Sequence, residues 1–300
     1  MPAGVTLSGY FIHILLMTTD GLHVIYQLIN KLLQMKHILF LFVLTLFVAA
    51  CEKDEDIIPE TVNLQTIATA SSETGYFNVE LLAGELLFQG YNKLYLDIMK
   101  NSDGSRITQA SVSLLPLMHM TTMTHAAPFE NPKNTPNDDG YFEGAVVFIM
   151  PSNPDEGWTL EVAIDAGGQK DTVIFTIPVV NSLEEAREFN VVSESAGKTY
   201  FISLTEPSKP KVGLNDIEFT IHYRENMMNF PAAEDLSVTI EPEMPSMNHG
   251  SPNNVNPVHT GNGHYKGKVN FTMTGWWRVN IEVSKDGQPI GENLSFDITF

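Results

Sequence analysis

Beyond residue 62 the chain consists largely of short segments in which apolar and polar residues alternate. The clearest runs have their apolar residues at Leu94/Leu96/Ile98, Val146/Phe148/Met150 and Leu160/Val162/Ile164. A period of two places successive side chains on opposite faces of a strand, so each run predicts a half-buried β-strand. Clusters of Gly, Pro, Asn and Asp separate the runs, as expected for turns. The pattern predicts an all-β protein.

Most of the alternating segments occur twice in the same order. The matching pairs are Gly90–Ile98 with Gly213–Ile221, Ser111–Pro116 with Ser237–Pro242, Met120–Pro128 with Met244–Pro252, Asn131–Thr135 with Asn256–Thr260, Phe142–Met150 with Tyr265–Met273, and Trp158–Ile164 with Trp277–Val283. Ordered matches of this kind predict a tandem duplication of a domain of roughly 115 residues. About seven strands and one inward Trp per copy predict two immunoglobulin-like β-sandwiches. We place the first domain at 63–181 and the second at 189–300. A helical linker is expected at 182–188, because Ser182 and Glu185 have the spacing of a capping box.

The N-terminal part predicts export and anchoring. Residues 35–50 have the features of a signal peptide: a short basic start, an apolar run over 38–48 that is too short for a comfortable span, and small residues before Cys51. The ending Val-Ala-Ala-Cys resembles the lipobox of bacterial lipoproteins, which implies that lipid on Cys51 attaches the protein to the membrane. Residues 1–34 are interpreted as an over-called start, the alternative being a first transmembrane segment.

The composition narrows the range of partners. The formal charge is −19, from 17 basic and 36 acidic side chains. Nucleic acids and anionic membranes repel such a surface, so membrane attachment is expected to come from the lipid. An acidic tether is expected over 51–62. Its start resembles an export tag of surface-displayed lipoproteins and is equally explained as a solvated linker. We therefore expect a location in the bacterial cell envelope, with the leaflet left open.

One family resemblance rests on the second copy. The sequence Met-Pro-Ser-Met-Asn-His-Gly at 244–250 is followed by Gly-x-Tyr-x-Gly-x-Val-x-Phe-x-Met from Gly263 and by Trp-x-Val-x-Ile from Trp277. This arrangement resembles the YtkA-like/FixH-like family of envelope β-sandwich domains. The resemblance is weaker in the first copy, where the corresponding loop carries a two-residue insertion. It implies a small extracytoplasmic sandwich, and the family's link to copper handling and oxidase assembly implies a role with that metal.

Methionine and histidine gather in the two matched loop regions. Five of the six histidines after Cys51 and five of the ten methionines lie there, namely Met118, His119, Met120, Met123 and His125 in the first copy and Met244, Met247, His249, His259 and His264 in the second. Thioethers suit Cu(I), and imidazole suits copper and zinc. We predict one copper site from Met120, Met123 and His125 and another from Met244, Met247 and His249. The remaining four residues, Met118, His119, His259 and His264, would serve as accessory donors.

Two other interpretations of the loops remain open. Methionine fills gaps in β-sandwich cores, as expected for Met150 and Met273, so the loops could be packing elements. The loops could also form an interaction surface for a protein or glycan. Trp276 alternates outward and could serve as an aromatic platform, a lid over the copper loop or an inter-domain contact.

No motif predicts catalysis. The chain lacks a Gly-x-Ser-x-Gly elbow, a Gly-x-x-x-x-Gly-Lys phosphate loop and a His-Glu-x-x-His zinc motif. We expect a non-enzymatic protein that captures, buffers or transfers copper together with a delivery partner. The alternative is a surface-exposed interaction module without metal.

Overall fold

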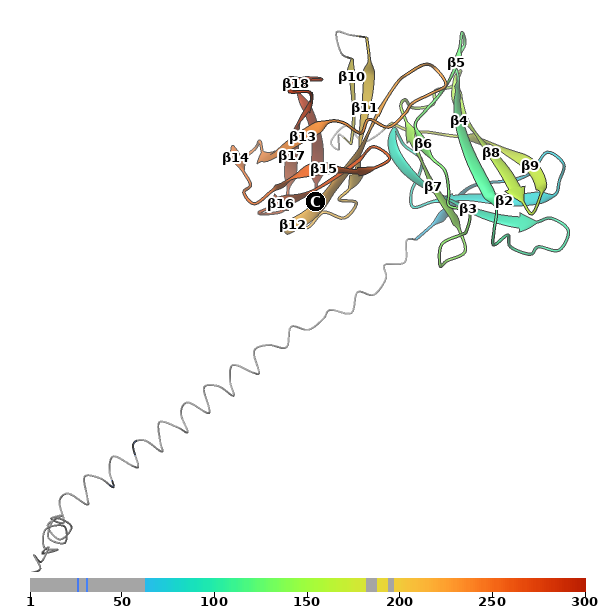
Figure 1. Ribbon diagram of the computed structural model, residues 1–300, viewed down its shortest axis with the longest axis horizontal. Coiled ribbons are helices and arrows are strands. Elements are labelled where there is room, and N and C mark those ends of the chain that lie inside the picture. Colours follow the sequence, from blue (N-terminus) through green and yellow to red (C-terminus); the bar gives the residue numbers. More distant parts are fainter. Residues whose placement is uncertain (1–25, 27–30, 32–62, 182–187, 194–196) are drawn as a thin grey trace, which may run out of the picture. The chain divides into compact units, whose positions relative to one another are not determined.

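The computed structural model of the chain describes residues 26, 31, 63–181, 188–193 and 197–300 (Figure 1). Residues Val62–Phe300 form one compact unit. The expected signal peptide, the Cys51 lipid site, the tether over 51–62 and most of the expected linker helix lie outside the described residues. Among the residues described, no helix is long and apolar enough to cross a membrane.

The first copy folds into two antiparallel sheets. In spatial order, one sheet contains β1 (Gln65–Ser71), β2 (Phe77–Ala83), β3 (Gly90–Lys100), β7 (Phe142–Phe148) and β6 (Phe129–Glu130). The other contains β5 (Thr124–Ala126), β4 (Ser111–His119), β8 (Gly157–Ala166) and β9 (Gln169–Ile177).

The second copy repeats this arrangement. One sheet contains β10 (Phe189–Ser193), β11 (Thr199–Glu206), β12 (Gly213–Tyr223), β16 (His264–Phe271) and β15 (Val255–Gly261). The other contains β14 (His249–Gly250), β13 (Ser237–Met244), β17 (Trp276–Lys285) and β18 (Gln288–Pro289), with β19 (Leu294–Thr299) also paired to β17. The prediction of two tandem immunoglobulin-like β-sandwiches is therefore confirmed.

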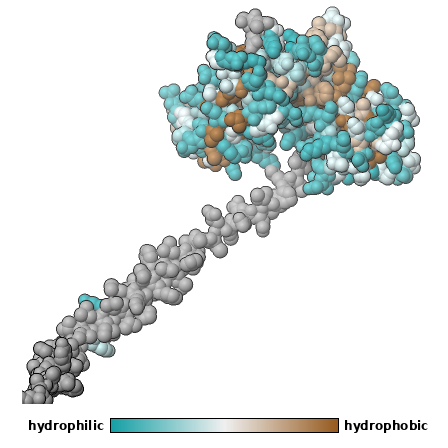
Figure 2. All heavy atoms as spheres, viewed as in Figure 1, coloured by the Kyte–Doolittle hydropathy of each residue, from teal (hydrophilic) through white to brown (hydrophobic). Residues whose placement is uncertain are grey.

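Each sandwich has its own hydrophobic core between its sheets. Trp158 and Phe148 are fully buried in the first core, and Trp277 and Phe271 occupy the matching places in the second. Burial of each such side chain contributes about 1.5–3 kcal/mol to the free energy of folding, so burial in these cores supplies most of the free energy that favours folding. On the face shown in Figure 2, hydrophilic side chains cover most of the described surface, with smaller apolar areas between them.

The repeated Gly-x-Asn motif satisfies backbone groups at the start of the central strand. Asn92 accepts a hydrogen bond from the Phe88 N–H at 3.0 Å and donates to the carbonyls of Phe88 and Gly90 at 2.7 and 2.9 Å. Asn215 makes the same three bonds four and two residues upstream. The glycine two positions before each Asn takes a positive φ, 133° at Gly90 and 103° at Gly213, which explains why glycine occurs there in both copies.

A second repeated glycine permits a close backbone crossing. In the first sandwich a Cβ on Gly144 would lie 2.8 Å from the Glu130 carbonyl oxygen. In the second sandwich a Cβ on Gly267 would overlap the Val255 carbonyl oxygen and approach Pro257 N to 2.9 Å. Both obstacles are backbone atoms of the neighbouring edge segment, which a side chain cannot push aside without breaking strand pairing.

Gly267→Ala is therefore expected to destabilise the second sandwich by about 1–3 kcal/mol, the usual cost of overpacking a tight site. Urea unfolding of residues 52–300 would measure the loss. Gly157→Ala is the matched control, because a Cβ there meets nothing within 4 Å. Equal stability of the two variants would contradict the close crossing.

Candidate functional site

The first Met/His loop is the tip of the hairpin formed by β4 and β5. Met118 pairs directly with His125, and the Met120 N–H donates to the Met123 carbonyl at 2.9 Å. Because side chains alternate along each strand, this register places all four of these side chains on one face of the hairpin. His119 points to the opposite face. Three thioethers and one imidazole are thus neighbours on a single surface.

The four side chains run from the core to the solvent. Met118 is completely buried, Met120 packs against the same core, and Met123 is 46% exposed at the tip. The His125 Nδ1–H donates to the Ala126 carbonyl at 2.8 Å, which holds the ring and leaves Nε2 as the nitrogen with a free lone pair.

The second Met/His loop joins β13 to β14. Met244 pairs directly with His249, and the Met247 N–H donates to the Met244 carbonyl at 3.1 Å. Asn248 takes a left-handed φ of 51° in the turn. Met244 is buried, His249 is half-buried, and Met247 is 57% exposed.

Both histidines stand edge-on to the buried tryptophan of their sandwich. The His125 and Trp158 ring centroids are 5.5 Å apart at an interplanar angle of 84°. The His249 and Trp277 centroids are 5.7 Å apart at 89°. A Met–His cross-strand pair beside a buried Trp therefore occurs in each sandwich, which the sequence repeat alone did not show.

The structure corrects the alignment of the two loops. The sequence comparison matched Met120 with Met244, but the residue that pairs with the histidine is Met118 in the first copy and Met244 in the second. Pairing of β4 with β8 places Met118 opposite Trp158, and pairing of β13 with β17 places Glu243, the residue before Met244, opposite Arg278. These pairings fix the register of β4 and β13. The two-residue insertion is therefore absorbed at the tip of the first hairpin, and Met120 is an additional thioether without a counterpart in the second.

Three predicted accessory donors do not join these clusters. His119 lies on the other face of its hairpin, with Nε2 2.9 Å from the Thr159 hydroxyl. His264 begins β16, while Phe271 at the other end of that strand contacts Trp277 with ring centroids 5.4 Å apart. Seven residues of strand span roughly 23 Å, so His264 lies far from that Trp and the neighbouring loop.

His259 lies at the same end of the sheet as His264. Its Nε2 accepts from the Gly263 N–H at 3.3 Å, and its ring centroid is 5.3 Å from that of Tyr265. The structure therefore does not bring His259 and His264 to the His249 loop. Trp276 is 36% exposed, with the Arg278 guanidinium 5.1 Å from its ring centroid, so it is occupied by a cation–π contact.

Residues 194–282 match the model of the YtkA-like family. The match lies within the second sandwich, which we call the YtkA-like domain. Solved structures similar to this chain include domains 5–6 of the S-layer protein SbsC, with 13% identity, a TM-score of 0.27, and 79% of this chain and 97% of that chain covered. They also include the Escherichia coli adhesin FdeC, with 14% identity, a TM-score of 0.23, and 77% and 65% covered. No curated protein matches the chain.

In the YtkA-like domain, His264 is enclosed by two carboxylates. Its Nδ1 lies 2.6 Å from Glu218, and its Nε2 lies 2.7 Å from Glu130 of the first sandwich. Burial lowers the pKa of His264, but the hydrogen bonds and charges of Glu130 and Glu218 outweigh burial, so the pKa is raised. The His264 ring thus links the sandwiches through its contact with Glu130, and the ring centroids of Tyr91 and His264 are 5.9 Å apart.

Sequence reasoning missed His222, a buried histidine near the same place. Its side chain is on the face of β12 that does not enter the core of the YtkA-like domain, yet it is only 4% exposed. Burial lowers its pKa to about 4, so the ring is neutral at pH 7. The alternation of β12 predicts an exposed position, and only contact with residues outside the sheet explains the burial.

The donor chemistry differs between the two regions. Across the described ranges, no three His, Cys, Asp or Glu side chains come together as a group that could hold a metal ion. The hairpins gather thioethers with one imidazole each instead. This set favours a soft monovalent ion such as Cu(I) over hard, oxygen-preferring cations.

Proposed function

We propose that the chain is a lipid-anchored cell-envelope protein that binds Cu(I) at two Met/His hairpins, for capture, buffering or transfer. The observation that carries this proposal is the repeated pairing of a methionine with a histidine beside a buried tryptophan, Met118/His125/Trp158 and Met244/His249/Trp277. A residue needed only to fill core volume would not have to be a thioether paired with an imidazole in both copies.

The first hairpin supplies the fuller ligand set. Met118, Met120, Met123 and His125 offer three sulfur atoms and one nitrogen from one face, which suits the soft Cu(I) ion. The hydrogen bond from His125 Nδ1 to a backbone carbonyl fixes the tautomer that presents Nε2, as in many metal-binding histidines. The adjacent Trp158 ring adds a π surface that attracts a cation.

The second hairpin offers Met244, Met247 and His249, one thioether fewer than the first. Met123 and Met247 are the exposed members of their sets, so an ion would enter at these side chains and then move to the buried pair. Exposed, flexible thioether ligands favour exchange with a delivery partner over permanent storage. We propose no catalytic role.

The burial of Met118 and Met244 is the strongest observation for a packing role alone. Both sulfur atoms lie in hydrophobic cores, where methionine commonly fills gaps. Packing does not account for the exposed Met123 and Met247, since apolar side chains gain nothing from solvent exposure. A copper role accounts for both positions, with one ligand held by the core and one free to capture the ion.

The envelope location and lipid attachment belong to the same proposal. They rest on the lipobox-like sequence before Cys51 and on the acidic composition. A formal charge of −19 raises the local concentration of cations around the protein and opposes binding to anionic lipid surfaces.

An anaerobic Cu(I) competition titration of residues 52–300 tests the proposal. We expect one or two equivalents to bind tightly, with Cu(II) and Zn(II) bound more weakly. A variant with alanine at Met120, Met123, His125, Met247 and His249 should lose this binding while retaining its β-sheet circular dichroism. Equal Cu(I) affinity of the folded variant and the wild-type chain would overturn the proposal.

A further inference from the structure

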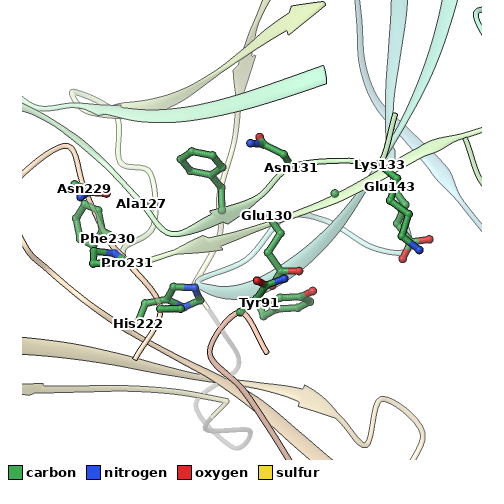
Figure 3. Close-up of a pocket in the computed structure, with 14 residues that line it drawn as sticks. Tyr91, Ala127, Glu130, Asn131, Lys133, Glu143, His222, Asn229, Phe230 and Pro231 are labelled. Carbon is green, nitrogen blue, oxygen red and sulfur yellow. The ribbon is translucent and has the colours of Figure 1, made fainter. Parts of the chain in front are cut away.

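A cavity of about 540 Å³ is lined by residues of both sandwiches. The first sandwich contributes Tyr91, Phe129 and Asn131, and the YtkA-like domain contributes His222, Asn229 and Phe230 (Figure 3). Its volume is in the range of typical small-molecule sites. None of these six residues belongs to the Met/His hairpins.

The decisive feature is an unsatisfied polar atom. His222 Nδ1 is buried and has no hydrogen-bond partner in the described part of the chain. A buried polar atom without a partner costs about 1–3 kcal/mol, and such atoms are rare in native proteins. A neutral imidazole carries one donor and one acceptor, so a ligand hydroxyl can satisfy Nδ1 in either tautomer.

Two asparagines are oriented by the protein before any ligand binds. Asn131 Oδ1 accepts from the Leu114 N–H at 2.8 Å, which leaves its Nδ2 donors. Asn229 Nδ2 donates to Glu225 at 2.5 Å, which leaves its Oδ1 acceptor. The cavity therefore has donors on one sandwich and an acceptor on the other, a combination that matches hydroxyl groups, which both donate and accept.

The rest of the lining favours a neutral ligand with an apolar face. Phe129 and Phe230 provide aromatic rings for C–H groups to pack against. Glu130 is already paired with His264 at 2.7 Å. Lys133 and Glu143, which lie on the same side of the cavity in Figure 3, have opposite charges. The site therefore offers no strong net charge to an ionic ligand.

From this geometry we infer that the cavity between the sandwiches binds a neutral, hydroxyl-rich small molecule of one or two sugar rings. His222 and the two oriented asparagines bond its hydroxyl groups, and the two phenylalanines pack against its C–H face. This inference is independent of copper, because it uses neither hairpin.

The test uses residues 62–300, which form one compact unit with two complete cores. The probes are free glucose, galactose, mannose and N-acetylglucosamine and their β-linked disaccharides. Each is added to about 50 mM, a concentration that nearly saturates a site with a dissociation constant of about 1 mM. We expect at least one probe to shift the His222 imidazole ¹⁵N resonances in a saturable manner, and calorimetry to report the same dissociation constant.

Matched variants decide whether the signal comes from the cavity. Phe129→Ala and Asn229→Ala should each weaken binding by about tenfold or more, while Tyr76→Ala, which removes an exposed aromatic ring outside the cavity, should leave it unchanged. Absence of any saturable His222 shift with every probe would overturn the inference. Binding of equal strength in Phe129→Ala, Asn229→Ala and Tyr76→Ala would also overturn it. Cu(I) titration of the same variants should be unaffected, so failure here is distinguishable from failure of the copper proposal.

Discussion

Substituting Met118 with Leu and His125 with Phe is expected to weaken Cu(I) binding at the first hairpin by about 100-fold or more, since removal of one ligand or its support commonly costs 10–100-fold. Leucine keeps the volume of the buried methionine, so the change removes the sulfur without opening a cavity. The second hairpin should keep its equivalent of copper. Competition titration and X-ray absorption at the copper edge would show the loss of sulfur ligands.

Two methionines outside the hairpins provide the control for this experiment. Met150→Leu and Met273→Leu alter residues whose carbonyls accept from the indole N–H of Trp158 and Trp277 and whose sulfur atoms belong to neither predicted ligand set. Both control variants should bind Cu(I) as the wild-type chain does. Met150 packs against the first core, whereas Met273 is 37% exposed, so the expectation that Met273 fills the second core is wrong. A similar loss in Met150→Leu and in the hairpin variants would mean that core packing, rather than ligation, governs the affinity.

The second large effect is a loss of folding stability at acidic pH, caused by His222. The pKa of His222 is lowered by burial to about 4, against 6.5 for an ordinary histidine; the nearby charge of Glu130 opposes the shift and His264 adds to it. The unfolded chain therefore binds a proton between these values that the folded chain does not. The pH-dependent contribution of His222 to the free energy of unfolding is fully present above pH 6.5 and is lost as the pH falls toward 4. The full shift corresponds to roughly 3 kcal/mol.

Urea unfolding at pH 7 and pH 4.5 would measure this effect. His222→Phe removes the titrating group at a buried site, and the variant should lose less stability on acidification than the wild-type chain. His249→Gln is the control, because this half-buried ring packs beside Trp277 at the hairpin. An identical acid-induced loss in all three proteins would show that groups other than His222 control acid unfolding.

The sequence itself determines the local architecture. Alternation along runs such as Leu160/Val162/Ile164 predicts strands because strand geometry repeats every two residues. The internal repeat predicts two sandwiches because equal patterns impose equal hydrogen bonds, as Asn92 and Asn215 show. The gathering of methionine and histidine was also visible in sequence, since its members lie within a few residues of one another in each hairpin.

Only the tertiary structure decided which of these residues meet. Pairing of β4 with β5 places Met118, and not Met120, opposite His125. The whole sheet sets this register, and the loop insertion changes the alignment only at the tip. His264 meets Glu130, 134 positions earlier in the chain. Contact with residues outside its own sheet buries His222. Residues of both sandwiches together line the cavity beside it. Such contacts depend on how two folded surfaces come together, and a local pattern of apolar and polar residues carries no information about that encounter.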